Sequence, residues 1–141
     1  MRSLRKQNKA FTLIEIMLVV IIIAALSAMV VPRLVGRSEQ AKVSVAKSDI
    51  NSQLATALKL YELDNGTFPS AEQGLVALRK KPSTTPEARN WNGPYIEKDP
   101  IDPWGSPYVY VSPGKKRPDY DLSSLGSDKN NSGDDINNWE E

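Results

Sequence analysis

The dominant pattern in the sequence is an apolar run near the amino terminus, over residues 11–31. Glu15 is the single charged residue within this run. A helix of this length covers roughly 31 Å, which is enough to cross the hydrocarbon core of a bilayer. The run ends in Val30, Val31 and Pro32 and lacks the small-residue cleavage site of a secretory signal. We therefore predict a membrane-spanning helix that is retained after export.

Beyond the apolar run, apolar positions recur every three or four residues, which predicts an amphipathic helix. The pattern stops at Asn65 and Gly66, where a glycine suits the left-handed cap conformation. Together with the apolar run this predicts one long helix over about residues 12–64, and we expect Pro32 and Gly36 to interrupt or loosen it. The apolar positions are Val43, Ala46, Ile50, Leu54, Ala57 and Tyr61.

The rest of the chain carries short elements separated by turns rich in proline and glycine. Ser70 and Gln73 have the spacing of a capping box, and the apolar residues after them predict a short second helix. Strand candidates follow at residues 95–97, 108–112 and 119–124, with turn residues between them. Sequential strands with short links favour an antiparallel meander. The predicted fold class is therefore α+β, with a long amino-terminal helix packed on a small antiparallel sheet.

Positive charge is concentrated at the amino terminus, although the whole chain carries a net charge of only +1. Basic residues precede the apolar run and none lies within it, which places the amino terminus in the cytoplasm and the rest of the chain outside the membrane. The remainder of the chain is mildly acidic, so it lacks the clustered basic residues that phosphate binding needs, and we exclude nucleic acid as a partner. The basic residues are Arg2, Arg5, Lys6 and Lys9.

The sequence contains no cysteine and no histidine. This excludes cysteine and histidine catalysis, together with zinc and iron sites of the usual ligand sets, and we predict that the chain is not an enzyme. A hydrolase that uses Asp134 and Asp135 is disfavoured, because these carboxylates lie in a polar segment with no apolar wall to raise a pKa. A small extracytoplasmic domain without disulfides needs another staple, such as a hard metal ion or packing against copies of itself.

Glu15 needs an explanation, because a carboxylate inside a membrane costs several kcal/mol unless it finds a partner. It could be a first-turn acid that the helix dipole stabilises near the headgroups. However, Ala10-Phe11-Thr12-Leu13-Ile14-Glu15 after a short basic leader resembles the precursor site of type IV pilins and pseudopilins. The resemblance implies that a prepilin peptidase cuts between Ala10 and Phe11 and methylates the new Phe11 amine. It also implies that Glu15 meets the amine of a neighbouring subunit.

The same resemblance divides the chain into three parts. Residues 1–10 are the cleaved leader, residues 11–31 the membrane and filament-core helix, and residues 32–141 a periplasmic head that includes the amphipathic half of the helix. The family usually has glycine immediately before the cut, where this chain has Ala10. Alanine is the smallest change available, so we expect slower cleavage at worst.

Motifs spread over the head narrow the resemblance to the major pseudopilin of the type II secretion system, the G subunit. This implies a structural subunit of a periplasmic pseudopilus anchored in the bacterial inner membrane, which supports export of folded proteins across the outer membrane. Its implied partners are copies of itself, minor pseudopilins, the prepilin peptidase, the inner-membrane assembly platform with its ATPase, and the secretin. The motifs are Tyr61-Glu62-Leu63-Asp64-Asn65-Gly66-Thr67-Phe68-Pro69, Glu72-Gln73-Gly74-Leu75, Asn90-Trp91-Asn92-Gly93-Pro94-Tyr95-Ile96, Asp99-Pro100, Asp102-Pro103-Trp104-Gly105, Ser124-Leu125-Gly126 and Asp135-Ile136-Asn137-Asn138-Trp139.

The alternative is an adhesive or DNA-uptake pilin, which would share the sequence only up to about Gly36. Adhesive pilins commonly carry a disulfide-bounded loop, and a chain without cysteine cannot form one. The head motifs therefore favour the secretion branch.

The segment of residues 124–136 is dense in oxygen donors and lacks soft ligands, which suits calcium. Its likeness to an EF-hand fails, because Trp139 stands where that loop needs glutamate, and a solvated acidic loop is the simpler explanation. The pseudopilin resemblance instead implies one bound calcium ion, which would serve as the missing staple. The implied ligands are the carboxylates of Asp128, Asp134 and Asp135 and the carbonyls of Leu125 and Ser132.

Overall fold

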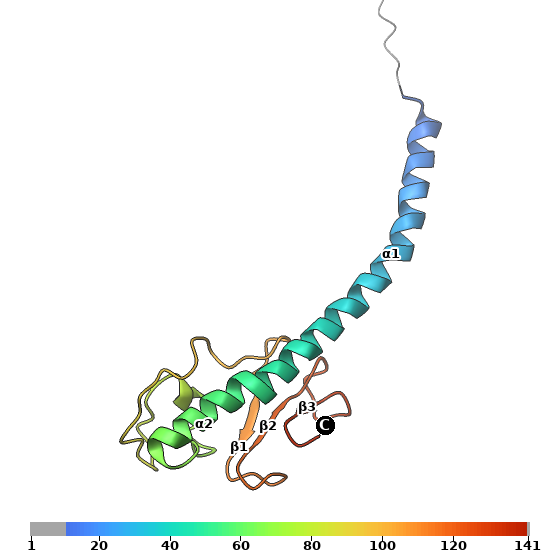
Figure 1. Cartoon of the computed structure of the whole chain (residues 1–141). Helices are drawn as coiled ribbons and strands as arrows, with labels where there is room; N and C mark the ends of the chain where they lie inside the picture. The colour runs from blue at the N-terminus through green and yellow to red at the C-terminus, as the bar shows by residue number, and fades with distance from the viewer. Residues whose placement is uncertain (1–10, 141) are drawn as a thin grey trace, which may run out of the picture. The chain divides into compact units, whose positions relative to one another are not determined.

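The computed structural model describes residues 11–140, with side chains described outside residues 31–35. The chain divides into two compact units between Glu39 and Gln40. Helix α1 (Leu13–Ser48) carries the apolar run, and its last residues belong to the second unit, which also holds every other element (Figure 1). The predicted leader, with Ala10, lies outside the described residues.

Helix α1 begins where Thr12 caps it. The Thr12 hydroxyl accepts a hydrogen bond from the Glu15 N–H at 3.2 Å, and its carbonyl accepts the N–H groups of Glu15 and Ile16 at 3.1 and 3.2 Å. The predicted interruption at Pro32 and Gly36 is wrong, since α1 continues through both residues. A proline inside a helix costs about 3 kcal/mol.

After Ser48 the helix changes its hydrogen-bonding pattern without ending. A π turn, η1 (Asp49–Gln53), leads into α2 (Leu54–Asn65), and the Leu54 N–H bonds to the Asp49 carbonyl five residues earlier. The apolar pattern did not predict this turn, because a four-residue spacing suits an α-helix and a π turn equally well. The predicted end of the helix is confirmed: Gly66 has φ +79°, and its N–H bonds to the Glu62 carbonyl at 2.7 Å.

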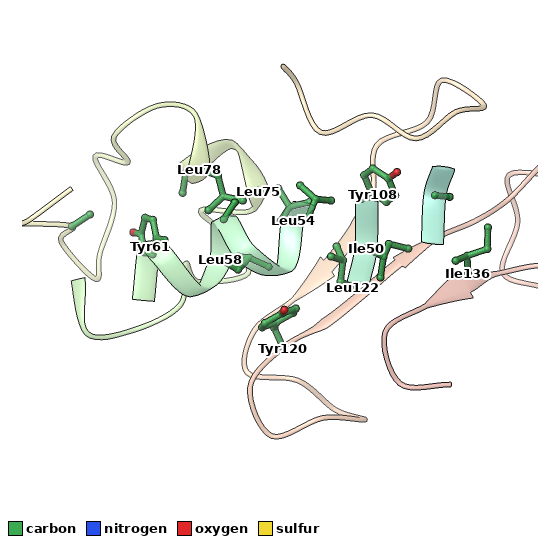
Figure 2. Packing of buried hydrophobic residues seen from close by; sticks show 14 residues of the cluster. Ile50, Leu54, Leu58, Tyr61, Leu75, Leu78, Tyr108, Tyr120, Leu122 and Ile136 are labelled. Carbon is green, nitrogen blue, oxygen red and sulfur yellow. The ribbon is translucent and has the colours of Figure 1, made fainter. Parts of the chain in front are cut away.

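The core of the second unit is built on the predicted apolar face. Ile50, Leu58 and Tyr61 are completely or almost completely buried, and Figure 2 shows them facing side chains from later segments of the chain. The other predicted positions from Ala46 to Ala57 are also buried, and Val43 packs against the cluster. The later segments contribute Leu75, Leu78, Tyr108, Tyr120, Leu122 and Ile136.

The predicted capping box forms, but it closes a turn. Ser70 N–H donates to the Gln73 side-chain oxygen at 3.0 Å, and Gln73 N–H donates to the Ser70 hydroxyl at 3.2 Å. Gly74 then has φ +59°, which ends the turn, and a short 3-10 helix follows, η2 (Leu75–Leu78). The Gln73 amide also donates to the carbonyls of Thr84 and Pro86, at 2.8 Å each, and so fixes the proline-rich loop.

The sheet is the predicted antiparallel meander, in the order β1-β2-β3. β1 (Val109–Val111) pairs with β2 (Asp121–Ser124), and β2 pairs with β3 (Ile136–Asn137). The strands predicted at residues 108–112 and 119–124 are present in shortened form, as β1 and β2. The prediction of a strand at residues 95–97 is wrong. The Tyr95 N–H bonds instead to the Leu78 carbonyl of η2, at 2.7 Å.

A buried carboxylate fixes the end of β2. One Asp102 oxygen accepts the N–H groups of Trp104 and Ser106 at 3.0 and 2.8 Å, and the other accepts the Ser124 hydroxyl at 2.6 Å. Ser124 in turn accepts the Gly126 N–H at 3.2 Å. The segment that follows β2 therefore leaves the sheet from a fixed point.

Candidate functional site

The first candidate site is the exposed apolar helix. Residues Leu13–Val30 are long and apolar enough to cross a membrane, and none of this stretch is buried within the described chain. Phe11, at the start of the described chain, is 78 % exposed. An apolar surface of this length must be covered by lipid or by other polypeptide chains.

Glu15 lies in the first turn of this helix and is exposed. Thr12 accepts its backbone N–H, while its carboxylate has no ion-pair partner among the side chains that the structure describes. A carboxylate next to the amino end of a helix is stabilised by the helix dipole, but inside an apolar environment it still needs a cation. The Glu15 carboxylate is thus exposed at the start of the apolar helix.

The second candidate site is the acidic loop, residues 125–135, which connects β2 to β3. Ser132 joins two of the predicted ligands: its hydroxyl donates to the Asp134 carboxylate, and its N–H donates to the Asp135 carboxylate at 3.3 Å. Ser127 donates to Asp134 through both its N–H and its hydroxyl, each at 3.3 Å. The hydrogen bond from Ser132, with those from Ser127, lowers the pKa of the Asp134 carboxyl. Ser132 thus joins the Asp134 and Asp135 carboxylates.

Asp128 is not brought to the other two carboxylates. It accepts the N–H of Asn130 at 2.9 Å within its own turn, and its carbonyl accepts the Asn130 side chain at 2.8 Å. Leu125 is half-buried directly after β2, and Ser132 is exposed. Across residues 11–140 no three acidic side chains are gathered in the arrangement that holds a metal ion.

Gly126 allows two parts of the acidic loop, its own backbone and the Asp134 carboxylate, to lie in close contact. A Cβ atom at this position would lie 2.8 Å from an Asp134 carboxylate oxygen, and the residue has φ +68°. Only glycine allows both the backbone conformation and the contact. The Asp134 carboxylate therefore lies directly against the backbone next to Leu125, the predicted carbonyl ligand.

Sequence reasoning missed the loop on the other side of β2. The Asp121 carboxylate accepts three consecutive backbone N–H groups, from Lys115 at 2.7 Å, Lys116 at 2.9 Å and Arg117 at 2.9 Å. We call this three-residue segment the basic loop. The signal in the sequence was an aspartate inside a predicted strand, and it does not reveal from which N–H groups the carboxylate accepts hydrogen bonds.

Comparisons with known proteins agree with this architecture. Residues 33–139 match the family described as "Type II secretion system (T2SS), protein G", and residues 5–31 match the "Prokaryotic N-terminal methylation motif". The type II secretion system core protein G of Pseudomonas aeruginosa is 52 % identical over 96 % of this chain and 98 % of its own length. The core protein G of Vibrio cholerae is 46 % identical over 99 % of this chain and 96 % of its own length.

A solved structure gives the same result for the fold. The crystal structure of the major pseudopilin from the type 2 secretion system of enterohaemorrhagic Escherichia coli superposes with a TM-score of 0.66 at 42 % sequence identity. The match covers 78 % of this chain and 96 % of that one. The chain belongs to the type II secretion system protein G family, the major pseudopilins.

Proposed function

We propose that the chain is a structural subunit that polymerises into the periplasmic pseudopilus of a type II secretion system and so supports export of folded proteins across the outer membrane. The observation that carries this is the pairing of a family-specific head with an apolar helix that is entirely exposed. Such a helix can lie in the inner membrane before assembly and pack against copies of itself afterwards, so one surface serves both states.

Processing and assembly use the amino terminus. A prepilin peptidase cuts between Ala10 and Phe11, and the new Phe11 amine is methylated; the match of residues 5–31 to the methylation motif supports this step. Inside the filament the Glu15 carboxylate meets the Phe11 amine of a neighbouring subunit, which supplies the cation that this carboxylate lacks. Each apolar helix then enters the filament core without an unpaired charge.

The head faces the periplasm and the leader faces the cytoplasm before cleavage. The partners are other copies of the chain, minor pseudopilins, the inner-membrane assembly platform driven by its ATPase, and the outer-membrane secretin. The subunit performs no reaction itself. The alternative of an adhesive or DNA-uptake pilin is not favoured, because the family match covers the head, where the two classes differ.

Replacement of Glu15 tests the proposal. We expect Glu15→Gln to abolish both filament formation and secretion, with Glu72→Gln, an exposed acid of the head, as matched control. Mass spectrometry of the mature chain should find methylated Phe11 as its first residue. Deletion of the gene should stop secretion and leave surface pili intact. Normal secretion by the deletion strain would contradict the proposed function.

We further propose that the acidic loop binds one calcium ion. The donors there are all oxygens, which hard cations prefer. The pair of carboxylates joined by Ser132 supports the proposal, as does the contact of the Asp134 carboxylate with the backbone at Gly126. Asp134 and Asp135 would hold the ion with the Leu125 and Ser132 carbonyls, and Asp128 would join them through a movement of its exposed turn. The calcium ion would cross-link a segment whose side-chain hydrogen bonds are mostly exposed.

A further inference from the structure

A pocket of about 690 Å³ opens beside the π turn in the second unit. One wall is formed by helical residues from Asp49 to Thr56, and the other by residues 95–101 with Tyr108. Leu54, Ile96 and Ile101 give it apolar walls. Three carboxylates line it as well, those of Asp49, Glu97 and Asp99. We call it the Asp49 pocket.

Two of these carboxylates are available to a further cation. Asp49 accepts the Tyr108 hydroxyl at 2.8 Å and the Gln53 amide at 2.6 Å, which leaves further lone pairs on both oxygens. Burial, and then the hydrogen bond to Asp49, raises the pKa of Tyr108, so this donor keeps its proton. Glu97 is exposed and has no ion pair among the side chains that the structure describes, whereas Asp99 is already paired with Arg79. Lys98 is exposed and also lines the pocket, so its ammonium group competes with any incoming cation for these carboxylates.

The basic loop presents cations of the required kind. Its backbone N–H groups are all bound by Asp121, so its conformation is fixed. Arg117 is tied back to the Asn138 carbonyl at 2.8 Å, but the Lys115 and Lys116 side chains are exposed and make no ion pair among the described residues. A loop that is already ordered loses little entropy when it docks.

The pocket and the loop lie at opposite ends of β1. Tyr108 lines the pocket and directly precedes β1, while the basic loop follows the strand and leads through Tyr120 into β2; Figure 2 shows Tyr108 and Tyr120 well apart. A chain therefore cannot place its own basic loop in its own pocket. A contact between two different surfaces of identical chains is heterologous, and it repeats into an open helical filament when its rotation does not close a ring.

We propose that Lys115 and Lys116 of one copy dock into the Asp49 pocket of the next copy. The chemistry matches the lysine side chain, whose aliphatic stem lies along Leu54 and Ile101 while the ammonium group reaches Asp49 and Glu97. This inference rests on the proposed polymerisation and assigns one contact between heads within it.

Cysteine cross-linking tests the contact directly, since the chain has no cysteine of its own. In filaments of the full chain that carries Lys116→Cys with Glu97→Cys, mild oxidation should give a ladder of covalent trimers and longer species. Each single variant should give dimers at most, and the matched pair Lys116→Cys with Glu72→Cys should give no ladder. Filaments that form normally but yield no ladder from the first pair would overturn the docking contact and leave polymerisation intact.

Charge exchange provides a second, independent measurement. Lys116→Glu should reduce the amount of sheared filament by about tenfold, and adding Glu97→Lys to the same chain should restore most of it. No rescue by the exchange would contradict the contact. If the unaltered chain forms no filaments, the proposed function and the contact fail together. If Lys116→Glu lowers binding to anionic lipid vesicles and leaves the filaments unchanged, the lysines serve a membrane surface and the contact is overturned.

Discussion

The basic loop and the acidic loop flank β2 and are stabilised in opposite ways. In the basic loop the carboxylate of Asp121 accepts three backbone N–H groups, at 2.7 to 2.9 Å. In the acidic loop the carboxylates accept hydrogen bonds from exposed Ser127, Asn130 and Ser132, and Asp128 stands apart from Asp134 and Asp135. The basic loop has its counter-group in Asp121, whereas the acidic loop carries three carboxylates and a single lysine, Lys129, and is the loop for which we propose an external cation. We therefore expect the stability of the basic loop to depend on Asp121, and that of the acidic loop to depend on the calcium concentration of the solution.

The largest effect should come from Asp121→Ala. The change leaves three backbone N–H groups without their acceptor, and we expect it to lower the free energy of unfolding by about 3 kcal/mol. Chemical denaturation of the full chain in detergent, followed by tryptophan fluorescence, measures this. Glu72→Ala is the matched control and should change stability by less than about 0.5 kcal/mol. Equal effects of the two substitutions would break the comparison between the loops.

Asp128→Ala should act only when calcium is present. Binding to the folded loop alone stabilises by RT ln(1 + [Ca]/Kd), about 2.7 kcal/mol at a hundredfold excess over Kd. We expect the variant to lose the calcium-dependent rise in melting temperature and to match the unaltered chain in a chelator, because Asp128 is exposed and bonds only within its own turn. A rise that survives the substitution would show that Asp128 is not a ligand.

Two glycines give a smaller and paired test of how tightly each loop is packed. A Cβ at Gly114 would clash with the Arg117 carbonyl oxygen, whereas a Cβ at Gly133 would meet nothing within 4 Å. We expect Gly114→Ala to destabilise by about 2 kcal/mol and Gly133→Ala by less than about 0.5 kcal/mol. Thermal melting in the presence of a chelator compares them, and a larger loss at Gly133 would reverse our view of which loop is rigid.

The smallest effect concerns pH. Burial by itself would raise the pKa of Asp121, but the three backbone N–H groups outweigh it and hold the pKa below its usual range. A carboxyl with a lowered pKa in the folded state stabilises above its unfolded pKa, about 3.9, and this stability is lost as the pH falls through the folded pKa. Acid titration of folding in calcium-free buffer should therefore be less steep below about pH 4 for Asp121→Asn than for the unaltered chain. Identical curves would rule out this linkage.

Tyr95 shows why part of the fold escaped prediction. Tyr95 and Ile96 have the composition of a strand, but the Tyr95 ring packs edge-on against Tyr61 at 5.7 Å and its hydroxyl donates to Asp64 at 2.6 Å. The Tyr95 side chain thus packs against the end of α2 and takes no part in the sheet. β3 was not predicted, because a strand of two residues is too short to show a periodic pattern. Both depend on neighbours that are distant in the sequence.

The sequence alone determined the long helix, its buried face and its end at Gly66, because apolar periodicity and a glycine cap are local properties. It also indicated the family, since each motif that carries the resemblance is a short continuous segment of the sequence. Only the tertiary structure decided which carboxylates meet. It joined Asp134 to Asp135 through Ser132, separated Asp128 from them, and directed Asp121 onto the basic loop. These hydrogen bonds depend on the path that the backbone takes through each loop, which the order of apolar and polar residues does not specify.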